Sequence, residues 1–334
     1  AAVCASLTAA VIPLLRRARV VDVPGDRSLH RTPVPRGGGL AIVLAASLAT
    51  WTAVLAAVHL QGAVHAMSGV DVALMGLATV LAFALLGLIE DLFSVSVRTR
   101  LVLQLVLGAG LGLMAHSAFE VSLWWTPAIC VGTAALVNAT NFMDGANGLA
   151  CGHALLTSLW YVQVAAVAPV AGLGLVMVSV AGACLGFLPF NTPRAKVFLG
   201  DSGSYALGSA WAFAVTACLS RGVAVEAALA PVLVLLADTG YTLWMRLRAG
   251  QCWYAPHRLH VYQRLVCAGW PHWASALLVT LAAAACSALA ASSLLPSNRL
   301  WMPQVAMAAV LIVYLKMPSI IGAPNPFPTL RRAR

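Results

Sequence analysis

The chain has 334 residues, of which 61% are hydrophobic and only 9% are charged. A soluble globular protein carries about 25% charged residues, so this chain cannot cover a water-facing surface of its own size. The composition therefore argues against a soluble enzyme or a DNA-binding domain. The net charge of +10 is instead typical of a membrane protein with basic cytoplasmic loops.

Apolar runs occur along the whole chain. A bilayer core about 30 Å thick needs roughly 20 apolar residues per helix. The sequence predicts an all-α, polytopic membrane protein, with one transmembrane domain over residues 1–334 and about eleven transmembrane helices. We place these helices at 1–15, 38–60, 70–89, 101–115, 122–138, 148–167, 169–188, 203–219, 222–245, 273–295 and 301–317. The first is read as a helix, because a signal peptide would begin with a charged region.

The basic residues predict the orientation of these helices. Lysines and arginines gather in cytoplasmic loops. With eleven helices, 18 of the 20 fall on one side, and only Arg221 and Arg299 fall on the other. We therefore expect the N-terminus outside and the C-terminus in the cytoplasm. The cytoplasmic loops are then 16–37, 90–100, 139–147, 189–202 and 246–272, together with the tail after 317.

Five polar segments fall on this cytoplasmic side. Carboxylates and amides suit a metal ion such as Mg²⁺, and arginines and histidines suit phosphate groups. Next to a wall of apolar helices, they indicate a phosphoryl-transfer site with one lipid substrate. The segments are HRTPVPRGGG (30–39), GLIED (87–91), NATNFMDGANGL (138–149), VFLGDSGS (197–204) and PHRLHVYQRL (256–265).

The first two segments also have a plainer explanation. The first could be a basic loop beside a helix, and the carboxylates of Glu90 and Asp91 could form a solvated helix end paired with a nearby arginine. The spacing of Asn138, Asn141 and Asp144 puts them roughly along one helical face. A zinc site at the last segment is disfavoured by the cysteine spacing. Outside the five segments, Asp238 lies within the ninth apolar run, where an acid is costly and usually functional.

Together, in this order, the five segments resemble the polyprenyl-phosphate N-acetylhexosamine-1-phosphate transferases of glycosyltransferase family 4. Relatives in that superfamily include phospho-MurNAc-pentapeptide translocase. The last segment is most similar to the O-antigen-initiating branch, because the translocase has a histidine triplet there. The resemblance covers nearly the whole chain. One departure is Glu90, which stands where the family has the first Asp of a pair and reaches one methylene further.

The resemblance implies a role for each matching residue. The metal, Mg²⁺ or Mn²⁺ in its place, would be held by Asp201 and Asn141. Catalytic positions would be Asp91, Glu90, Asp144, His257 and His260. Substrates would be bound by Arg36, Asn138, Asn147, Phe198 and Arg258; of these, Phe198 matches an aromatic that stacks on uracil.

The reaction implied is transfer of N-acetylhexosamine 1-phosphate from a UDP-sugar to undecaprenyl phosphate, which releases UMP. That would be the first membrane step of a cell-envelope polysaccharide such as the O-antigen of lipopolysaccharide. It places the protein in the bacterial inner membrane with a cytoplasmic active site. No nucleic-acid partner is expected, and a homodimer is left open. The rival interpretations are a secondary transporter and a CDP-alcohol phosphatidyltransferase. Transporters often contain internal repeats, and the chain shows none.

Overall fold

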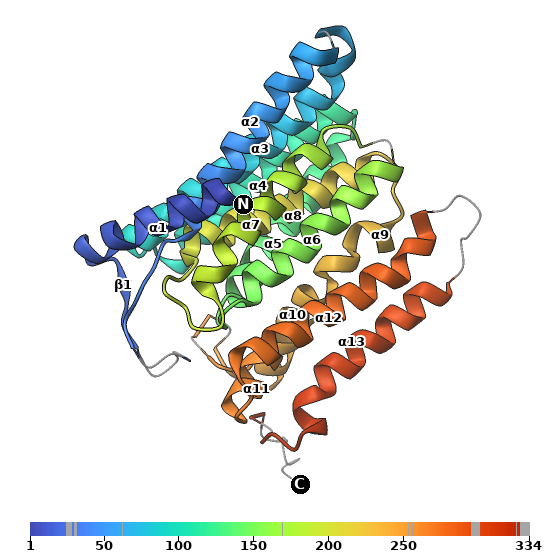
Figure 1. Cartoon of the computed structure of the whole chain (residues 1–334). Helices are drawn as coiled ribbons and strands as arrows, with labels where there is room; N and C mark the ends of the chain where they lie inside the picture. The colour runs from blue at the N-terminus through green and yellow to red at the C-terminus, as the bar shows by residue number, and fades with distance from the viewer. Residues whose placement is uncertain are drawn as a thin grey trace.

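The computed structural model describes residues 1–24, 29, 32–61, 63–168, 170–252, 254–255, 257–294, 301–324 and 326–327. They form a bundle of long helices, as the composition predicts (Figure 1). The helices are α1 Ala2–Arg17, α2 Gly39–Gln61, α3 Ala63–Phe93, α4 Val97–Phe119, α5 Thr126–Phe142, α6 Leu149–Val167, α7 Leu173–Asn191, α8 Gly200–Ser220, α9 Val225–Leu229, α10 Leu233–Arg248, α11 Val261–Cys267, α12 His272–Ala290 and α13 Met302–Ile320.

Short elements join these helices. Single 3₁₀ turns cover η1 Leu123–Trp125, η2 Ala230–Val232 and η3 Ala291–Leu294. The only strands in the described residues are β1 Val21–Asp22 and β2 Val34–Pro35, which pair antiparallel between α1 and α2. The all-α fold class is therefore confirmed.

Eight helical segments in the described chain are long and apolar enough to cross a membrane. They are α2, α3, α4, α6, α7, α9 with α10, α12 with η3, and α13. The predicted runs at 1–15, 122–138 and 203–219 correspond to α1, α5 and α8, so every predicted run lies on a helix. The predicted fourth run is short, whereas α4 extends over 23 residues from Val97 to Phe119. The protein is thus a multi-pass membrane protein.

Helix α8 lies at the centre of the bundle. Its residues 200–218 are all buried, and α3, α5 and α2 pack around it. The helix carries glycine, serine and alanine where its neighbours come close, for example Gly203, Ser204 and Ala210. Small residues allow helix backbones to approach, which is how helices associate inside a membrane. The central position of α8 fixes its N-terminus, and with it Asp201.

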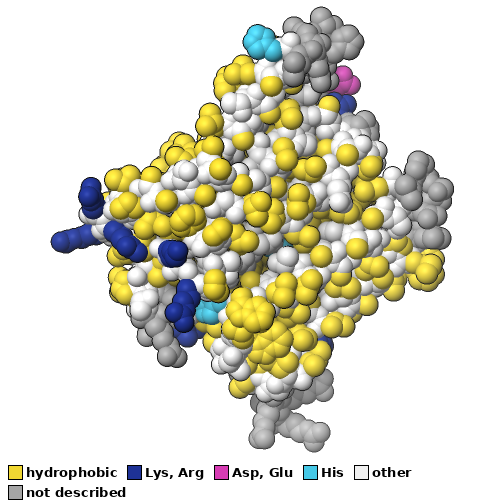
Figure 2. Space-filling model, viewed as in Figure 1, with side chains coloured by type: hydrophobic (Ala, Val, Ile, Leu, Met, Phe, Trp, Pro, Cys, Tyr) yellow, Lys and Arg dark blue, Asp and Glu magenta, His cyan; other side chains and the backbone are white. Residues whose placement is uncertain are grey.

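Apolar side chains cover the outside of the bundle. On α2, Leu44, Leu48, Trp51 and Leu55 are about half exposed and recur every three or four residues, so they form one stripe along the helix. Such a stripe would be unfavourable in water and suits lipid. Figure 2 shows hydrophobic side chains spread over the visible face, with lysines and arginines gathered towards the end of the bundle where α1 ends and the β strands lie.

The ninth apolar run, predicted at 222–245 as one span, is interrupted. Helix α9 ends at Leu229, and the 3₁₀ turn around Pro231 separates it from α10. The interruption leaves backbone carbonyls without helical partners, and side chains of α6 donate to them. Trp160 Nε1 donates to Ala227 O at 2.9 Å, and Tyr161 Oη donates to Ala228 O at 2.8 Å. Satisfying these carbonyls allows a broken helix at membrane depth.

Candidate active site

The first and fourth polar segments pair through their backbones at one end of the bundle. The Phe198 N–H donates to Pro35 O at 2.8 Å, and the Gly38 N–H donates back to Phe198 O at 2.9 Å. The Gly39 N–H donates to Leu199 O at 2.7 Å. These bonds hold the start of α2 beside the start of α8 and bring Arg36 to Asp201.

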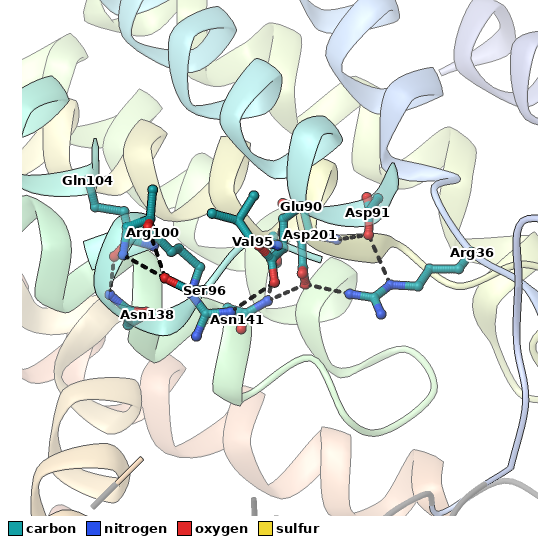
Figure 3. A network of polar contacts seen from close by, with 12 residues as sticks. Arg36, Glu90, Asp91, Val95, Ser96, Arg100, Gln104, Asn138, Asn141 and Asp201 are labelled. Atoms are coloured by element: carbon teal, nitrogen blue, oxygen red, sulfur yellow. Dashed lines mark hydrogen bonds and ion pairs between the residues drawn. The ribbon is translucent and has the colours of Figure 1, made fainter. Parts of the chain in front are cut away.

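Arg36 joins two carboxylates from different helices (Figure 3). Its Nε lies 2.9 Å from Asp91 Oδ1, and its Nη2 lies 2.8 Å from Asp201 Oδ1. Desolvation lowers the pKa of Arg36, but the attractions of Asp201 and Asp91 outweigh it and raise that pKa above its ordinary value. The guanidinium is therefore a fixed positive charge that offsets the repulsion between the two acids.

Asp91 also caps α8. Its Oδ1 accepts the Asp201 N–H and its Oδ2 accepts the Ser202 N–H, both at 2.9 Å. These N–H groups belong to the first turn of α8, where a negative charge is favoured. The Asp91 side chain is 2% exposed, whereas that of Arg36 is 37% exposed. Arg36 is thus open to a ligand, and Asp91 is enclosed by protein donors.

Two glycines make this approach possible. A Cβ on Gly87 of α3 would lie 2.2 Å from the Asp201 backbone oxygen, and one on Gly39 of α2 would lie 2.3 Å from Gly203 Cα. Any other residue would push α2 or α3 away from α8. The glycines of the first and second polar segments therefore serve close packing of backbones around Asp201.

Asn141 completes the cluster from the last turn of α5. Its Nδ2 lies 2.7 Å from Asp201 Oδ1 and 3.0 Å from Ser204 Oγ. A half-turn of the amide exchanges its nitrogen and oxygen, so the oxygen can also face Asp201. Adjacent oxygens around Mg²⁺ lie about 3 Å apart when each is about 2.1 Å from the ion. The Asp201–Asn141 separation fits that arrangement.

The donor set fits Mg²⁺ better than a softer metal. The described residues contain no group of three or more His, Cys, Asp or Glu side chains suited to a metal. Mg²⁺ is commonly bound by one or two carboxylates together with substrate phosphates. Asp201 and the Asn141 amide meet that requirement if a phosphate-bearing substrate supplies the remaining ligands.

Two predicted residues lie outside this cluster. Asn138, one turn before Asn141, donates to Gln104 Oε1 on α4 and to Ala134 O. Glu90 Oε1 pairs with Arg100 at 3.3 Å, and its Oε2 accepts the Val95 N–H at 3.0 Å. Both groups thereby connect α4 to its neighbours. The structure does not bring Asn138 or Glu90 to the Asp91–Arg36–Asp201 contacts.

Asp144 follows the end of α5, which stops at Phe142, so it does not continue the helical face of Asn141. No hydrogen bond or ion pair of its side chain is found within the described residues. Desolvation and the nearby Asp201 raise the pKa of Asp144 well above its ordinary value, and Arg36 partly offsets them. Asp144 is thus a half-buried acid near the cluster, with no recorded side-chain partner among the described residues.

The histidine segment contacts the end of α5. Tyr262 Oη donates to Phe142 O at 2.9 Å, and the His260 ring stacks on Phe142 with centroids 6.0 Å apart. His260 Nδ1 lies 3.0 Å from the buried carboxylate of Asp238. Phe142 directly follows Asn141, so the two polar clusters share one short stretch of chain.

The remaining predicted residues lie around this end of the bundle. The His257 ring is 4.9 Å from that of His260, and burial together with His260 and Arg246 lowers the pKa of His257 to about 4. Asn147 donates to Pro193 O at 3.2 Å. Phe198 and Arg258 are half-buried. His30, Arg31 and Pro256, which belong to the first and fifth segments, lie outside the described residues.

Sequence reasoning missed two features of the site. It assigned Arg36 to substrate phosphate and did not anticipate that it bridges Asp91 and Asp201. It identified Asp238 as a deep acid but gave it no partner, because the contact with His260 spans 22 residues. A carboxylate two turns inside an apolar run was the signal that such a partner exists.

Comparison with known proteins identifies the family. The glycosyl transferase family 4 model matches residues 72–219. A decaprenyl-phosphate N-acetylglucosaminephosphotransferase of Mycobacterium leprae is 31% identical over 82% of this chain and 79% of its own length. A probable undecaprenyl-phosphate N-acetylglucosaminyl 1-phosphate transferase of Bacillus subtilis is 27% identical over 81% of this chain and 77% of its own.

A phospho-N-acetylmuramoyl-pentapeptide-transferase of Desulforudis audaxviator is 32% identical over 59% of this chain and 68% of its own length. These similarities favour the transferase interpretation over the transporter and the CDP-alcohol enzyme. The chain belongs to glycosyl transferase family 4 and is a membrane-embedded sugar-phosphate transferase.

Proposed function

We propose that this enzyme transfers N-acetylglucosamine 1-phosphate from UDP-N-acetylglucosamine to undecaprenyl phosphate, giving the lipid-linked diphosphosugar and UMP. The observation that carries the proposal is the Asp91–Arg36–Asp201–Asn141 cluster at the start of α8. The names of the mycobacterial and Bacillus relatives support the sugar and the polyprenyl phosphate class. The reaction would begin a cell-envelope polysaccharide, of which O-antigen is one case.

The proposal includes the location of the site. Residues 1–334 would form one transferase domain in the bacterial inner membrane, and the loops at 16–37, 90–100, 139–147, 189–202 and 246–272 would face the cytoplasm. UDP-sugars are made in the cytoplasm, whereas the lipid acceptor approaches from the bilayer. An end of the bundle that carries both polar clusters and adjoins apolar helices suits these two substrates.

The chemical step is a direct displacement at phosphorus. An oxygen of the lipid phosphate forms a bond to the β-phosphorus of the nucleotide sugar. The bond from that phosphorus to the oxygen bridging to the α-phosphorus breaks, and its electron pair leaves with UMP. A phosphate monoester has a second pKa of about 6, so near pH 7 the nucleophile is already largely a dianion. Such a step requires positioning and charge neutralisation more than a strong base.

The residues would divide these tasks as follows. Arg36 is open to a ligand and would bind a donor phosphate, and Arg258 and His260 would bind the diphosphate from the other side. Asp201 and Asn141 would hold Mg²⁺, which supplies neutralisation of the phosphoryl oxygens when bound. Asp144 lies beside both clusters and would contact the nucleotide sugar. Asn147 and Phe198 would line the nucleotide pocket.

The geometry of Asp91 supports direct attack over a covalent phospho-aspartyl enzyme. Both of its oxygens accept hydrogen bonds from the start of α8, and its side chain is 2% exposed. A carboxylate enclosed in this way would lose its contacts with α8 before it could attack phosphorus. Asp91 would instead hold Asp201 and Arg36 in place. Double-reciprocal plots of initial rate against one substrate, at several fixed concentrations of the other, should then give intersecting lines. Parallel lines would favour the covalent route.

A donor and acceptor screen tests the proposal. Purified protein is incubated with undecaprenyl or decaprenyl phosphate and one of three donors: UDP-N-acetylglucosamine, UDP-N-acetylgalactosamine or a 6-deoxy-N-acetylhexosamine donor. The mass of the lipid product is then measured by mass spectrometry. We expect the N-acetylglucosamine product on undecaprenyl phosphate. A product with a different sugar would correct the donor, and no lipid product from any pair would reject the function.

A further inference from the structure

Asp238 is the most deeply buried acid of the described chain and takes no part in the Asp91–Arg36–Asp201 cluster. It is fully buried on α10, ten residues before that helix ends at Arg248. At 1.5 Å per residue this is about 15 Å from the helix end. A carboxylate at that depth is costly unless donors surround it, so its partners indicate its purpose.

Every recorded partner of Asp238 is a hydrogen-bond donor, and the donors come from three helices. His260 Nδ1 lies 3.0 Å from Oδ1, and the Val261 N–H lies 3.0 Å from Oδ2. Tyr314 Oη on α13 donates to Oδ2 at 2.7 Å, and Thr242 Oγ1 donates to Oδ1 at 3.2 Å. Asp238 thus joins α10, the start of α11, and α13.

These contacts decide which ring nitrogen of His260 carries a hydrogen. A carboxylate surrounded by donors can only accept, so the hydrogen between it and the ring belongs to Nδ1. That holds whether the ring is neutral or protonated. The His260 side chain also faces the Gln263 backbone N–H in a capping box at the start of α11, and no hydrogen bond to Nε2 is found within the described residues. Nε2 is the nitrogen left for a ligand.

The ring is also fixed in orientation. It has stacked contacts with the rings of both Phe142 and Tyr262, with centroid separations of 6.0 and 6.2 Å. Tyr262 is itself tied to Phe142 O, next to Asn141. The ring therefore has a defined position relative to the α5–α6 connection, and its Nδ1 contacts Asp238.

We propose that Asp238 is a positioning residue for the transfer reaction. It accepts the Nδ1 hydrogen of His260 and so presents Nε2 to a phosphate oxygen of the donor. This inference rests on the proposed function, because it assigns His260 to the donor phosphates. The pairing follows the same physical logic as a carboxylate that orients a metal-binding or catalytic histidine, where loss of the carboxylate costs about 10- to 100-fold in activity.

A double-mutant cycle tests the role. Asp238→Asn keeps the size of the side chain and removes its charge. We expect kcat to fall about 10- to 100-fold in the wild-type background, with a smaller change in KM for the UDP-sugar. In the His260→Ala background, the same substitution should cost no more than about twofold, because the residue it acts through is gone. An equal loss in both backgrounds would overturn the proposal.

Tyr314→Phe is the matched control. It removes one donor to the same carboxylate without touching the ring. We expect it to leave kcat within about twofold, although it lowers the melting temperature. A loss as large as that of Asp238→Asn would show that the network acts only through packing. If Asp238→Asn does not accumulate as folded protein, Asp238→Glu, which displaces the charge by one methylene, replaces it in the cycle.

A spectroscopic measurement separates this inference from the proposed function. In protein labelled with ¹⁵N-histidine, the NMR signals of the His260 ring are those that disappear in His260→Asn. We expect these signals to show the hydrogen on Nδ1 in the wild type. In Asp238→Asn we expect the hydrogen to be no longer held mainly on Nδ1. An Nδ1 without hydrogen in the wild type would overturn the inference. Because no substrate is present, failure of the transfer assay alone would reject the function and leave this result unchanged.

Discussion

Arg36 and Asp91 show how one cluster can combine packing with chemistry. Asp91 is buried and caps α8, whereas Arg36 reaches from the same contact to the surface. The Asp91 carboxylate beneath the guanidinium accepts two backbone N–H groups of α8, and under the proposed function the more exposed Arg36 would bind phosphate. At this scale, exposure separates Arg36, which reaches the surface, from Asp91, which holds the start of α8.

The first prediction concerns Asp201. We expect Asp201→Asn to reduce transfer by more than about 100-fold, because loss of a ligand should exceed the 10- to 100-fold cost of losing a group that only orients one. The dependence of the rate on Mg²⁺ should shift to higher concentrations. The control is Asp71→Asn, the same change in the N-terminal part of α3, far along that helix from Asp91; it should keep normal activity. Near-normal activity of Asp201→Asn at low Mg²⁺ would remove Asp201 from the metal site.

The second prediction concerns pH and His257. Its pKa is lowered from the ordinary 6.5 to about 4, chiefly by burial, with Asp238 partly opposing the effects of His260 and Arg246. Between pH 7 and pH 5 the unfolded chain takes up a proton that the folded chain refuses, so acid favours unfolding. We expect the melting temperature in detergent to fall over this range, and to fall less in His257→Asn. An identical decrease in both proteins would contradict the lowered pKa.

At the scale of helices, the packing of α3 on α8 determines the geometry of the site. Gly87 touches the backbone of Asp201, and four residues later Asp91 caps α8. One helix therefore supplies both the close contact and the cap. The spacing of Gly87 and Asp91, one turn apart on α3, therefore has a direct structural meaning.

The third prediction follows from that contact. In Gly87→Ala the new Cβ would meet the Asp201 backbone oxygen at 2.2 Å, so α3 must move. Overpacking of this kind costs about 1–3 kcal/mol. We expect a lower melting temperature and a lower transfer rate, since Asp91 moves with the helix. Gly132→Ala on α5, where nothing lies within 4 Å, is the control. Equal melting temperatures for the two variants would show that α3 and α8 are not so closely packed.

Hydropathy was sufficient to predict the helices, because each long apolar run must bury its backbone polar groups within a helix. It could not predict the interruption at Pro231. The carbonyls that the interruption leaves free, those of Ala227 and Ala228, accept hydrogen bonds from Trp160 and Tyr161, 67 residues earlier in the chain. Window averages contain no information on such distant partners. The same limit hid the contact between Asp238 and His260.

Local patterns likewise predicted which residues matter more readily than what each one contacts. Asn138 and Asn141 are a turn apart on α5, yet one faces Gln104 on α4 and the other faces Asp201 on α8. Their separation depends on how α4 and α8 pack on either side of α5. Only the assembled bundle decides that, and no spacing in the sequence records it.

At the scale of the whole molecule, the polar segments converge on one end of the bundle (Figure 1). The basic residues gather towards the same end in the visible face (Figure 2). This agreement between charge and site motivates the orientation of the protein in the membrane.

The fourth prediction tests that orientation. Arg194→Cys and Arg221→Cys are made after the exposed Cys252 and Cys267 have been replaced by serine. In sealed cells, a membrane-impermeant thiol reagent should label the cysteine at 221 and not the one at 194. Labelling of both after the cells are opened is the control for access. External labelling at 194 would reverse the orientation and put the site on the outer face.

The transfer of a sugar phosphate, rather than a sugar alone, is the central claim, and the fate of the β-phosphorus tests it most directly. Purified protein is given undecaprenyl phosphate and UDP-N-acetylglucosamine labelled with ³²P at the β-phosphorus. We predict that the label enters the lipid, with one unlabelled UMP released for each lipid-linked product and none released when the lipid phosphate is left out. Release of the label as UDP, or formation of UMP without the lipid, would contradict the account.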